Sequence, residues 1–172
     1  MERHRVWRVG EGVDTDALAP GAYMKLELPE MARHCLESRY PGLASALRSG
    51  DVIVAGPSFG IGSSREQAVG VLVQLGVKAV IAPSFSGLYF RNAFNLGLLA
   101  IVCPEADRIS EGSYVEIDTE HSLLRLYDKQ DVDGDAVHAP EILQCQRIPS
   151  FLVEMATAGG LLAQLQQKLS TT

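Results

Sequence analysis

The sequence predicts an α/β fold in which a small, largely parallel sheet is flanked by helices and extended by antiparallel strands. Two observations lead to this prediction. Between residues 51 and 103, short runs of Val, Ile and Leu alternate with helical patterns, which is typical of parallel strands buried on both faces. Between residues 113 and 127, apolar and polar residues alternate, as in antiparallel strands with one face in water.

Length and composition narrow the class of protein. We expect one domain over residues 1–172, with a substantial core because 47% of the residues are hydrophobic. The net charge of −6 argues against a general nucleic-acid surface. Cys35, Cys103 and Cys145 form no C-x-x-C pair, so no metal site is predicted in this chain. Without a signal-peptide pattern or a long apolar span, we expect a cytoplasmic protein with no membrane association.

The elements follow in a regular order. A short strand is expected at 5–9, a loop rich in Gly, Asp and Pro at 10–21, and short helices at 29–36 and 42–47. The predicted parallel strands are 51–55, 77–82 and 98–103, and the helices between them are 67–75 and 87–96. Gly97 is placed to end the second of these helices, and Cys103 is expected to be a buried thiol.

The last third has a different pattern. Antiparallel strands are expected at 113–118 and 122–127. The Asp-rich segment 131–135 resembles the start of an EF-hand loop, but its twelfth position is Ile142, so a hairpin turn is expected there instead of a calcium site. Residues 150–169 indicate a closing helix that is interrupted at Gly159 and Gly160.

The most informative stretch is 56–66, Gly-Pro-Ser-Phe-Gly-Ile-Gly-Ser-Ser-Arg-Glu, where a strand turns into a helix. Its glycines permit positive φ angles and close backbone approach. A helix start offers unpaired N–H groups that favour an anion, and the planar guanidinium of Arg65 suits a carboxylate or a phosphate. The turn is therefore a candidate site for an acid.

A purely structural interpretation of the same stretch stays open. Ser63 and Ser64 are placed to cap the helix, with Glu66 and Gln67 spaced for a capping box. Ser-capped helices after glycine turns also occur in proteins that bind nothing there. The run is neither G-x-G-x-x-G nor a Walker loop, because no Lys-Ser/Thr pair follows its last glycine, so a nucleotide is not the favoured anion.

Residues 60–68, G-I-G-S-S-R-E-Q-A, resemble the G-x-G-S-S-R-E-H/Q-A signature of the aconitase superfamily. More narrowly, the chain resembles the family of 3-isopropylmalate dehydratase small subunits and their relatives. Residues 13–20 resemble the family's V-D-T-D-x-I-x-P loop, 79–86 its A-V-I-A-x-S-F-A segment, and 91–97 its R-N-A-x-N-x-G helix. The resemblance is strongest over about residues 5–105 and implies an aconitase-type swivelling domain (β/β/α).

The resemblance implies an enzyme subunit that moves a hydroxyl between neighbouring carbons of a 2-hydroxy di- or tricarboxylic acid, by dehydration and rehydration. Abstracting a proton next to a carboxylate requires a base and a means of stabilising the carbanion. By resemblance, Ser63 is the base and acts as an alkoxide, so neighbouring N–H groups and cations must lower its pKa. Ser64 and Arg65 would bind a substrate carboxylate, and Asp16 with Thr15 would orient these groups.

The resemblance also implies a partner and a cofactor. The leaving hydroxyl needs a Lewis acid, which in this family is a four-iron, four-sulfur cluster whose cysteine ligands lie in a separate large subunit. The scattered cysteines of this chain agree with that division. Alone, the chain would hold half an active site and be inactive, so a heteromer is expected.

Residues 21–26, Gly-Ala-Tyr-Met-Lys-Leu, follow the V-D-T-D-like loop, where the family selects its substrate side chain. Tyr23, Met24 and Lys25 are therefore candidate substrate-binding residues. Met24 suits an isopropyl group, whereas Lys25 suits a second distal carboxylate unless it is merely solvated. 3-Isopropylmalate, an acid of leucine biosynthesis, is the first expectation. Homocitrate, homoaconitate and the small methylated malates, including citraconate-type and dimethylmalate substrates, stay open.

Two other classes of function also stay open at this point. One is a stand-alone anion- or phosphate-binding module that uses the same turn. The other is a structural or regulatory subunit that has kept the fold but lost catalysis. Separately, purely structural interpretations of Ser64 as a helix cap and of Asp14 as a turn former stay open. Intact Ser63, Ser64 and Arg65 argue against a loss of catalysis.

Overall fold

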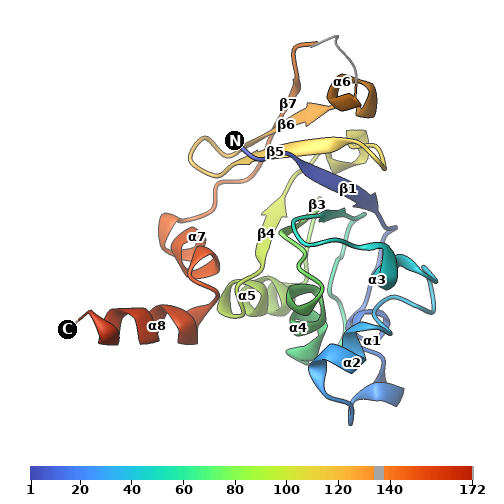
Figure 1. The fold of residues 1–172 in the computed structure, drawn as a ribbon, viewed down its shortest axis with the longest axis vertical. Helices are drawn as coiled ribbons and strands as arrows, with labels where there is room; N and C mark the ends of the chain where they lie inside the picture. The colour runs from blue at the N-terminus through green and yellow to red at the C-terminus, as the bar shows by residue number, and fades with distance from the viewer. Residues whose placement is uncertain (134–137, 172) are drawn as a thin grey trace.

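The computed structural model describes residues 1–133 and 138–171 and confirms an α/β fold around one seven-stranded sheet (Figure 1). The strand order is β4-β3-β2-β1-β5-β6-β7. Strands β1 to β4 pair in parallel, and β5, β6 and β7 continue from the other side of β1 as antiparallel strands. The parallel strands and the additional antiparallel strands that the sequence predicts are thus two halves of one sheet. The strands are β1 (His4–Arg8), β2 (Val52–Val54), β3 (Ala79–Ala82), β4 (Leu99–Val102), β5 (Tyr114–Asp118), β6 (Leu123–Tyr127) and β7 (Glu141–Gln144).

The helices up to α6 lie in the connections between strands, and α7 and α8 follow the last strand. Helices α4 and α5 are in contact beside the parallel half, and α1 and α2 pack against α4 (Figure 1). Helix α7 packs on α5, and α8 projects away from the rest of the molecule (Figure 1). The helices are α1 (Thr15–Leu18), η1 (Gly21–Tyr23), α2 (Leu28–Ala32), α3 (Leu43–Ala46), α4 (Gln67–Gln74), α5 (Gly87–Asn95), η2 (Ala106–Arg108), α6 (Lys129–Asp133), α7 (Ser150–Thr157) and α8 (Leu161–Ser170).

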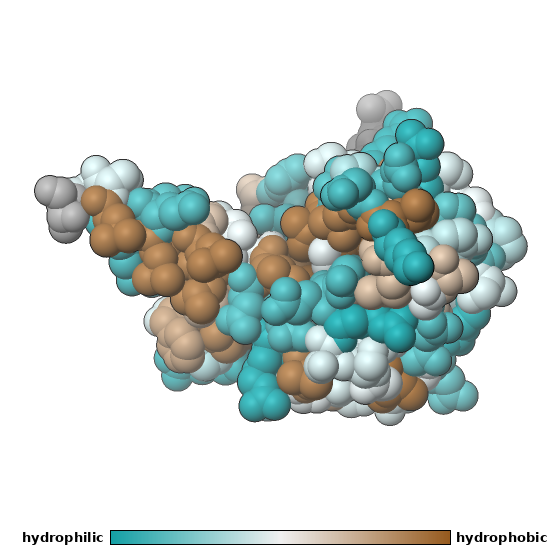
Figure 2. All heavy atoms as spheres, turned by 90° about the horizontal axis from the view of Figure 1, so that it is seen from below, coloured by the Kyte–Doolittle hydropathy of each residue, from teal (hydrophilic) through white to brown (hydrophobic). Residues whose placement is uncertain are grey.

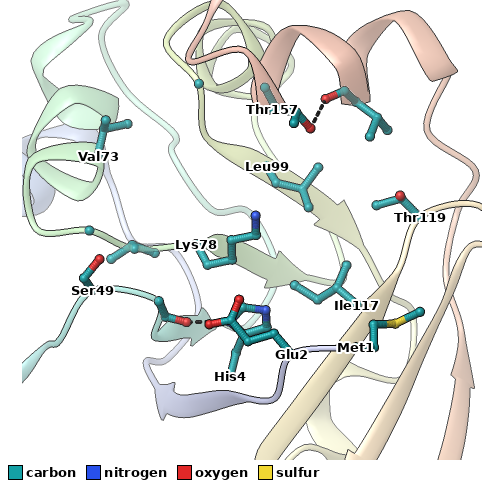
Figure 3. A pocket seen from close by; sticks show the side chains of 16 residues that line it. Met1, Glu2, His4, Ser49, Val73, Lys78, Leu99, Ile117, Thr119 and Thr157 are labelled. Carbon is teal, nitrogen blue, oxygen red and sulfur yellow. Dashed lines mark hydrogen bonds between the residues drawn. The ribbon is translucent and has the colours of Figure 1, made fainter.

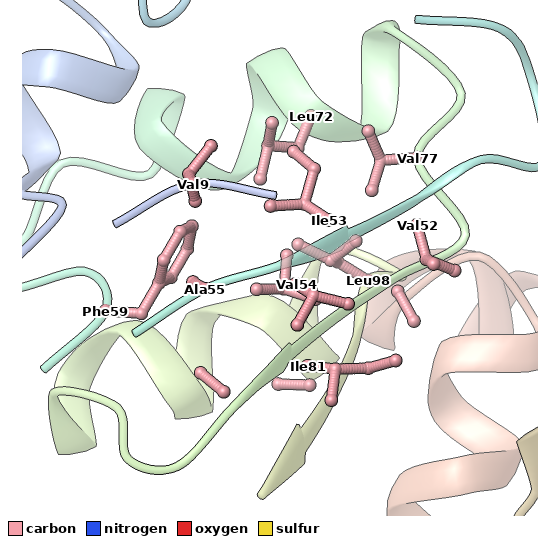
Figure 4. Packing of buried hydrophobic residues seen from close by; sticks show 14 of the residues in the cluster. Val9, Val52, Ile53, Val54, Ala55, Phe59, Leu72, Val77, Ile81 and Leu98 are labelled. Carbon is pink, nitrogen blue, oxygen red and sulfur yellow. The ribbon is translucent and has the colours of Figure 1, made fainter. Parts of the chain in front are cut away.

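The core is centred on strand β2. All three of its residues are fully buried, as predicted for a strand covered on both faces. Figure 4 shows Ile53 and Val54 packed among Leu72 of α4, Ile81 of β3 and Phe59 of the following loop. Truncating a side chain such as Ile53 to Ala is expected to cost about 2–5 kcal/mol of folding free energy. This rigid centre is what holds the loops after the parallel strands in place.

Several sequence predictions in the first hundred residues are confirmed with shifted bounds. The two short helices exist as α2 and α3, but each is shorter than expected. Gly97, with φ of +89°, follows the end of α5 as expected, and the Cys103 thiol is buried. The expected loop at 10–21 instead contains α1, because an Asp14 carboxylate oxygen accepts the Ala17 N–H at 2.7 Å and caps a helical turn.

The last third differs from prediction in one element. The expected antiparallel pair is confirmed as β5 and β6, and the closing helix is divided into α7 and α8 at the two glycines. Strand β7 was not predicted, because only Leu143 of its four residues is buried and the period-2 signal is lost. Of the expected turn at 131–135, the part up to Asp133 belongs to α6, and the remainder lies outside the described residues.

Candidate active site

Two loops meet where the parallel strands end. Because β1 and β2 are parallel neighbours, the loops that follow them leave the same edge of the sheet. The backbone N–H of Thr15 donates to the carbonyl of Ile61 at 2.8 Å, and the N–H of Gly60 donates to the carbonyl of Val13 at 2.7 Å. The V-D-T-D-like loop and the glycine-rich loop therefore form one hydrogen-bonded unit.

Glycine is required at two points of this unit. Gly60 has φ of +81° and Gly62 has φ of +113°, in a region that other residues rarely adopt. A Cβ atom on Gly60 would overlap the ring of Tyr89, and one on Gly62 would lie 2.8 Å from the Thr15 hydroxyl oxygen. The glycines thus allow the close approach that brings Ser63 against Thr15.

Ser63 is held by a threonine and a cation. Its backbone N–H donates to Thr15 Oγ1 at 3.0 Å, and the two hydroxyl oxygens are 3.2 Å apart. The Nε–H of Arg65 donates to Ser63 Oγ at 2.9 Å. Thr15 is buried, whereas Ser63 is exposed. A guanidinium that donates to a hydroxyl oxygen stabilises the deprotonated form of that hydroxyl.

Arg65 is itself positioned by the first loop. Its Nη1 donates to Asp16 Oδ1 at 3.2 Å and to the Ala19 carbonyl at 2.8 Å. The backbone N–H of Gly21, followed by the Arg65 guanidinium, lowers the pKa of Asp16, so this carboxylate is ionised at neutral pH. Within the described residues, Arg65 Nη2 has no hydrogen-bond partner. The arginine therefore offers a ligand one nitrogen, and not the two-nitrogen fork that the sequence suggests.

The predicted helix cap is wrong. Helix α4 begins at Gln67, and Glu66 at its N-cap makes no side-chain capping bond. Ser63 and Ser64 precede that position because Ser63 is turned toward Thr15 instead. Ser64 is exposed, and its carbonyl accepts the Asn92 side-chain amide at 3.3 Å. Sequence reasoning gave Asn92 no role, although the R-N-A-x-N-x-G resemblance contained it.

The side chain of Tyr23, in the segment after α1, is held by residues that follow α2. The ring of Tyr23 stacks on that of His34, with centroids 3.7 Å apart and an interplanar angle of 11°. His34 Nδ1 lies 2.8 Å from Glu37 Oε2, and the Tyr23 hydroxyl donates to the same carboxylate, which raises the pKa of Tyr23. Tyr23 therefore contacts the turn after α2, and not Ser63 or Arg65.

Met24 and Lys25 point to different environments. Met24 is half-buried and lines a mostly apolar groove of about 330 Å³, which also contains Glu66 and Gln67 of the glycine-rich signature. Lys25 is exposed and does not line this groove. The apolar lining of the groove comprises Met24, Leu26, Leu28, Met31, Gly70 and Leu96.

A larger cavity lies at the opposite edge of the parallel strands. It has a volume of about 560 Å³ and is lined by residues at the amino ends of the strands, including Lys78 and Leu99, and by α7 (Figure 3). None of the candidate site residues lines it. Ser63 is instead exposed at the edge where the strands end.

Histidine, cysteine and acidic side chains are dispersed over the residues that the structure describes. Among residues 1–133 and 138–171, no three His, Cys, Asp or Glu side chains are grouped so that they could hold a metal ion. Cys35, Cys103 and Cys145 are free and buried. Burial raises the pKa of Cys35 to about 12. None of the helices in the described part of the chain is long and apolar enough to cross a bilayer.

Comparison with known proteins gives a consistent result. Residues 40–106 match the model of the aconitase C-terminal domain family. The 3-isopropylmalate dehydratase small subunit of Halothermothrix orenii is 40% identical over 94% of this chain and 93% of its own length. Small subunit 1 of Thermotoga maritima is 37% identical over 97% and 96%, respectively. The crystal structure of 3-isopropylmalate dehydratase from Methanocaldococcus jannaschii superimposes with a TM-score of 0.84, at 35% identity, over 98% of this chain and 95% of that one.

Proposed function

Because the chain belongs to the family of 3-isopropylmalate dehydratase small subunits, we propose that it forms half of the active site of a two-subunit hydro-lyase. The reaction would interconvert 2-isopropylmalate and 3-isopropylmalate in leucine biosynthesis. The observation that carries the proposal is the 2.9 Å hydrogen bond from Arg65 Nε to Ser63 Oγ. This bond holds the Arg65 guanidinium against the Ser63 hydroxyl, which must lose its proton to act as the base in this proposal.

The residues of this chain have distinct roles in the proposal. Ser63, as the alkoxide, takes the proton from the carbon next to a carboxylate, and the electron pair moves into that carboxylate as its aci form. Arg65 stabilises the alkoxide through Nε and binds the developing charge through Nη2. Thr15 positions the Ser63 side chain and Asp16 positions the Arg65 side chain through hydrogen bonds. The exposed Ser64 hydroxyl is a further donor to the substrate carboxylate.

Departure of the hydroxyl needs a Lewis acid, which we assign to a four-iron, four-sulfur cluster in the large subunit. The described residues do not fit such a group, since the three cysteines are buried and no metal-binding cluster is found among them. Free thiols throughout are also compatible with a reducing cytoplasm.

The substrate is proposed from the groove beside the signature. Met24 and its apolar neighbours next to Gln67 suit an isopropyl group, which gains free energy on leaving water. Lys25 faces solvent and does not line this groove, so an acid with a second distal carboxylate has no cation there. This observation favours isopropylmalate over homocitrate or homoaconitate.

Reconstitution tests the two-subunit proposal. The purified chain is expected to be colourless, to contain no iron and to have no dehydratase activity until the large subunit is added. Iron content, the visible spectrum and turnover of 3-isopropylmalate before and after mixing are the measurements. A stoichiometric iron–sulfur chromophore in this chain alone would contradict the proposal.

A further inference from the structure

Two of the three cysteines meet where the two ends of the sheet come together. Strands β4 and β7 are the edge strands of the sheet. Directly after β7, the N–H of Cys145 donates to the carbonyl of Ser122 at 2.8 Å. The N–H of Gln146 then donates at 2.9 Å to the carbonyl of Val102, the last residue of β4. The segment after β7 thus reaches the free edge of β4 and brings the sheet back on itself.

The register at this closure places Cys103 opposite Cys145. Cys103 comes one residue after Val102, and Cys145 one residue before Gln146, so they are the antiparallel neighbours of the bonded pair. Their side chains interact, because the Cys145 thiol donates a hydrogen bond to the Cys103 sulfur. Opposite residues of antiparallel strands have Cβ atoms about 4.5–5.5 Å apart, and a disulfide needs about 3.5–4.5 Å. A small approach of the two chains is therefore enough to join the sulfur atoms.

The position of the pair selects a small oxidant. Cys103 is fully buried, and Cys145 is 8% exposed. Cys145 lines a cavity of about 10 Å³, which has the size of a single water molecule. Hydrogen peroxide consists of two oxygen atoms and is close to this size, whereas oxidised glutathione is far larger. The pair is therefore accessible to peroxide and protected from exchange with larger disulfides.

The surroundings of the pair favour a thiolate, which is the reactive form of cysteine. The hydrogen bond from the Cys145 thiol, followed by that from the Glu105 backbone N–H, lowers the pKa of Cys103 despite its burial. The same pairing raises the pKa of Cys145. Cys103 is thus the nucleophile of the pair. Cys35 differs, because burial raises its pKa to about 12 and neither of the other thiols contributes to that rise.

We propose that Cys103 and Cys145 are a peroxide-sensitive modification site, at which an intramolecular disulfide closes the sheet. The Cys103 thiolate attacks hydrogen peroxide, the O–O bond breaks, and a sulfenic acid and a hydroxide form. The Cys145 sulfur then attacks the Cys103 sulfur, the S–S bond forms, and the sulfenic oxygen leaves as hydroxide. The two thiol protons and the two hydroxides give two waters. The thiols thereby lose two electrons, which the peroxide gains.

The disulfide anchors the C-terminal part of the chain. Cys145 precedes the segment that leads into α7 and α8, and Figure 2 shows the exposed apolar side chains of α8 along the projecting helix. The bond joins the base of this part to the end of β4. Because a cross-link restricts the unfolded chain, the oxidised protein resists unfolding more than the reduced one. Neither cysteine belongs to the catalytic loops, so the site is independent of the proposed activity.

Treatment of the full wild-type chain with a small excess of hydrogen peroxide tests the proposal. Thiols titrated after denaturation should fall from three to one, and peptide mapping should find Cys103 bonded to Cys145 and Cys35 unmodified. Oxidised glutathione should leave all three thiols of the native chain free. Three free thiols after peroxide treatment would overturn the proposal. A bridge to Cys35, a mixed disulfide with glutathione, or separate sulfinic acids without a bridge would overturn it as well.

Serine variants provide matched controls. Cys145→Ser should lose the bridge and Cys35→Ser should keep it. On oxidation, Tm should rise by about 5–10 °C in the wild type and in Cys35→Ser, fall back on reduction by dithiothreitol, and stay unchanged in Cys145→Ser. An equal rise in Cys145→Ser, or a lower Tm of the oxidised wild type, would contradict a bridge at positions that the fold already brings together. If Cys145→Ser does not fold, peptide mapping of the wild type decides.

Discussion

The two edges of the parallel strands present opposite kinds of surface. The edge where the strands end carries a polar cluster of Thr15, Asp16, Ser63 and Arg65. Hydrogen bonds between these side chains hold them in position. At the edge where the strands begin, α7 and α8 present leucines and a phenylalanine with few charges. The function of the first surface depends on the exact positions of a few atoms, whereas binding at the second depends on how much apolar area is buried. Mutations at the two edges should therefore impair the protein in different ways.

The largest effect is expected for Ser63→Ala. Loss of the proposed base should lower kcat by about 10²–10⁴-fold and change KM much less, because the base acts in the transition state. Assembly with the large subunit should be unaffected, since the change removes one hydroxyl from an exposed residue and no apolar surface. Steady-state kinetics on the reconstituted complex are the measurement, and near wild-type turnover would show that the catalytic assignment is wrong.

The next effect is expected for Arg65→Lys. A lysine ammonium cannot donate to Ser63, Asp16, Ala19 and a substrate from fixed positions, so kcat should fall and KM should rise together, each by about tenfold or more. Lys78→Arg, at the other edge, is the matched control and should change neither constant. If Arg65→Lys altered KM alone, the proposed stabilisation of the alkoxide would be contradicted.

A smaller effect concerns substrate choice. Because Lys25 is solvated, Lys25→Leu should leave the ratio of kcat/KM for 3-isopropylmalate and homoaconitate nearly unchanged. Met24→Lys should shift the ratio toward the tricarboxylic acid by roughly tenfold, since about 1.4 kcal/mol corresponds to one decade. A competition assay with both acids measures the ratio. A large shift with Lys25→Leu would show that Lys25 faces the substrate in the complex.

The smallest effect concerns pH. The pKa of Asp16 lies below its ordinary value of 3.8, so the carboxylate stays ionised above that value and its contribution is lost only as the pH falls through the lowered pKa. The activity ratio of Asp16→Asn to wild type should therefore be constant between about pH 5 and pH 8. Parallel pH profiles of kcat/KM test this, and a ratio that changes within the window would mean that Asp16 titrates there.

The sequence alone determined the succession of strands and helices between residues 51 and 103, and it singled out the loop that we propose to be catalytic. Local patterns suffice for both, since buried strands such as β2 are continuous apolar runs and the G-x-G-S-S-R-E signature is contiguous. The same reasoning missed α1 and β7, where a side-chain cap and a mostly exposed edge strand left no periodic signal.

Only the tertiary structure decided what Ser63 touches. Thr15 and Asp16 are distant from Ser63 and Arg65 in sequence and meet them because β1 and β2 are parallel neighbours. The preference of serine for N-cap positions predicted that Ser63 and Ser64 cap the helix. In the structure the Ser63 N–H donates to Thr15 instead, and the helix begins only at Gln67. Contacts between distant segments determine such atom positions, because a hydrogen bond across two loops is set by how the strands before them pair, and no local pattern contains that information.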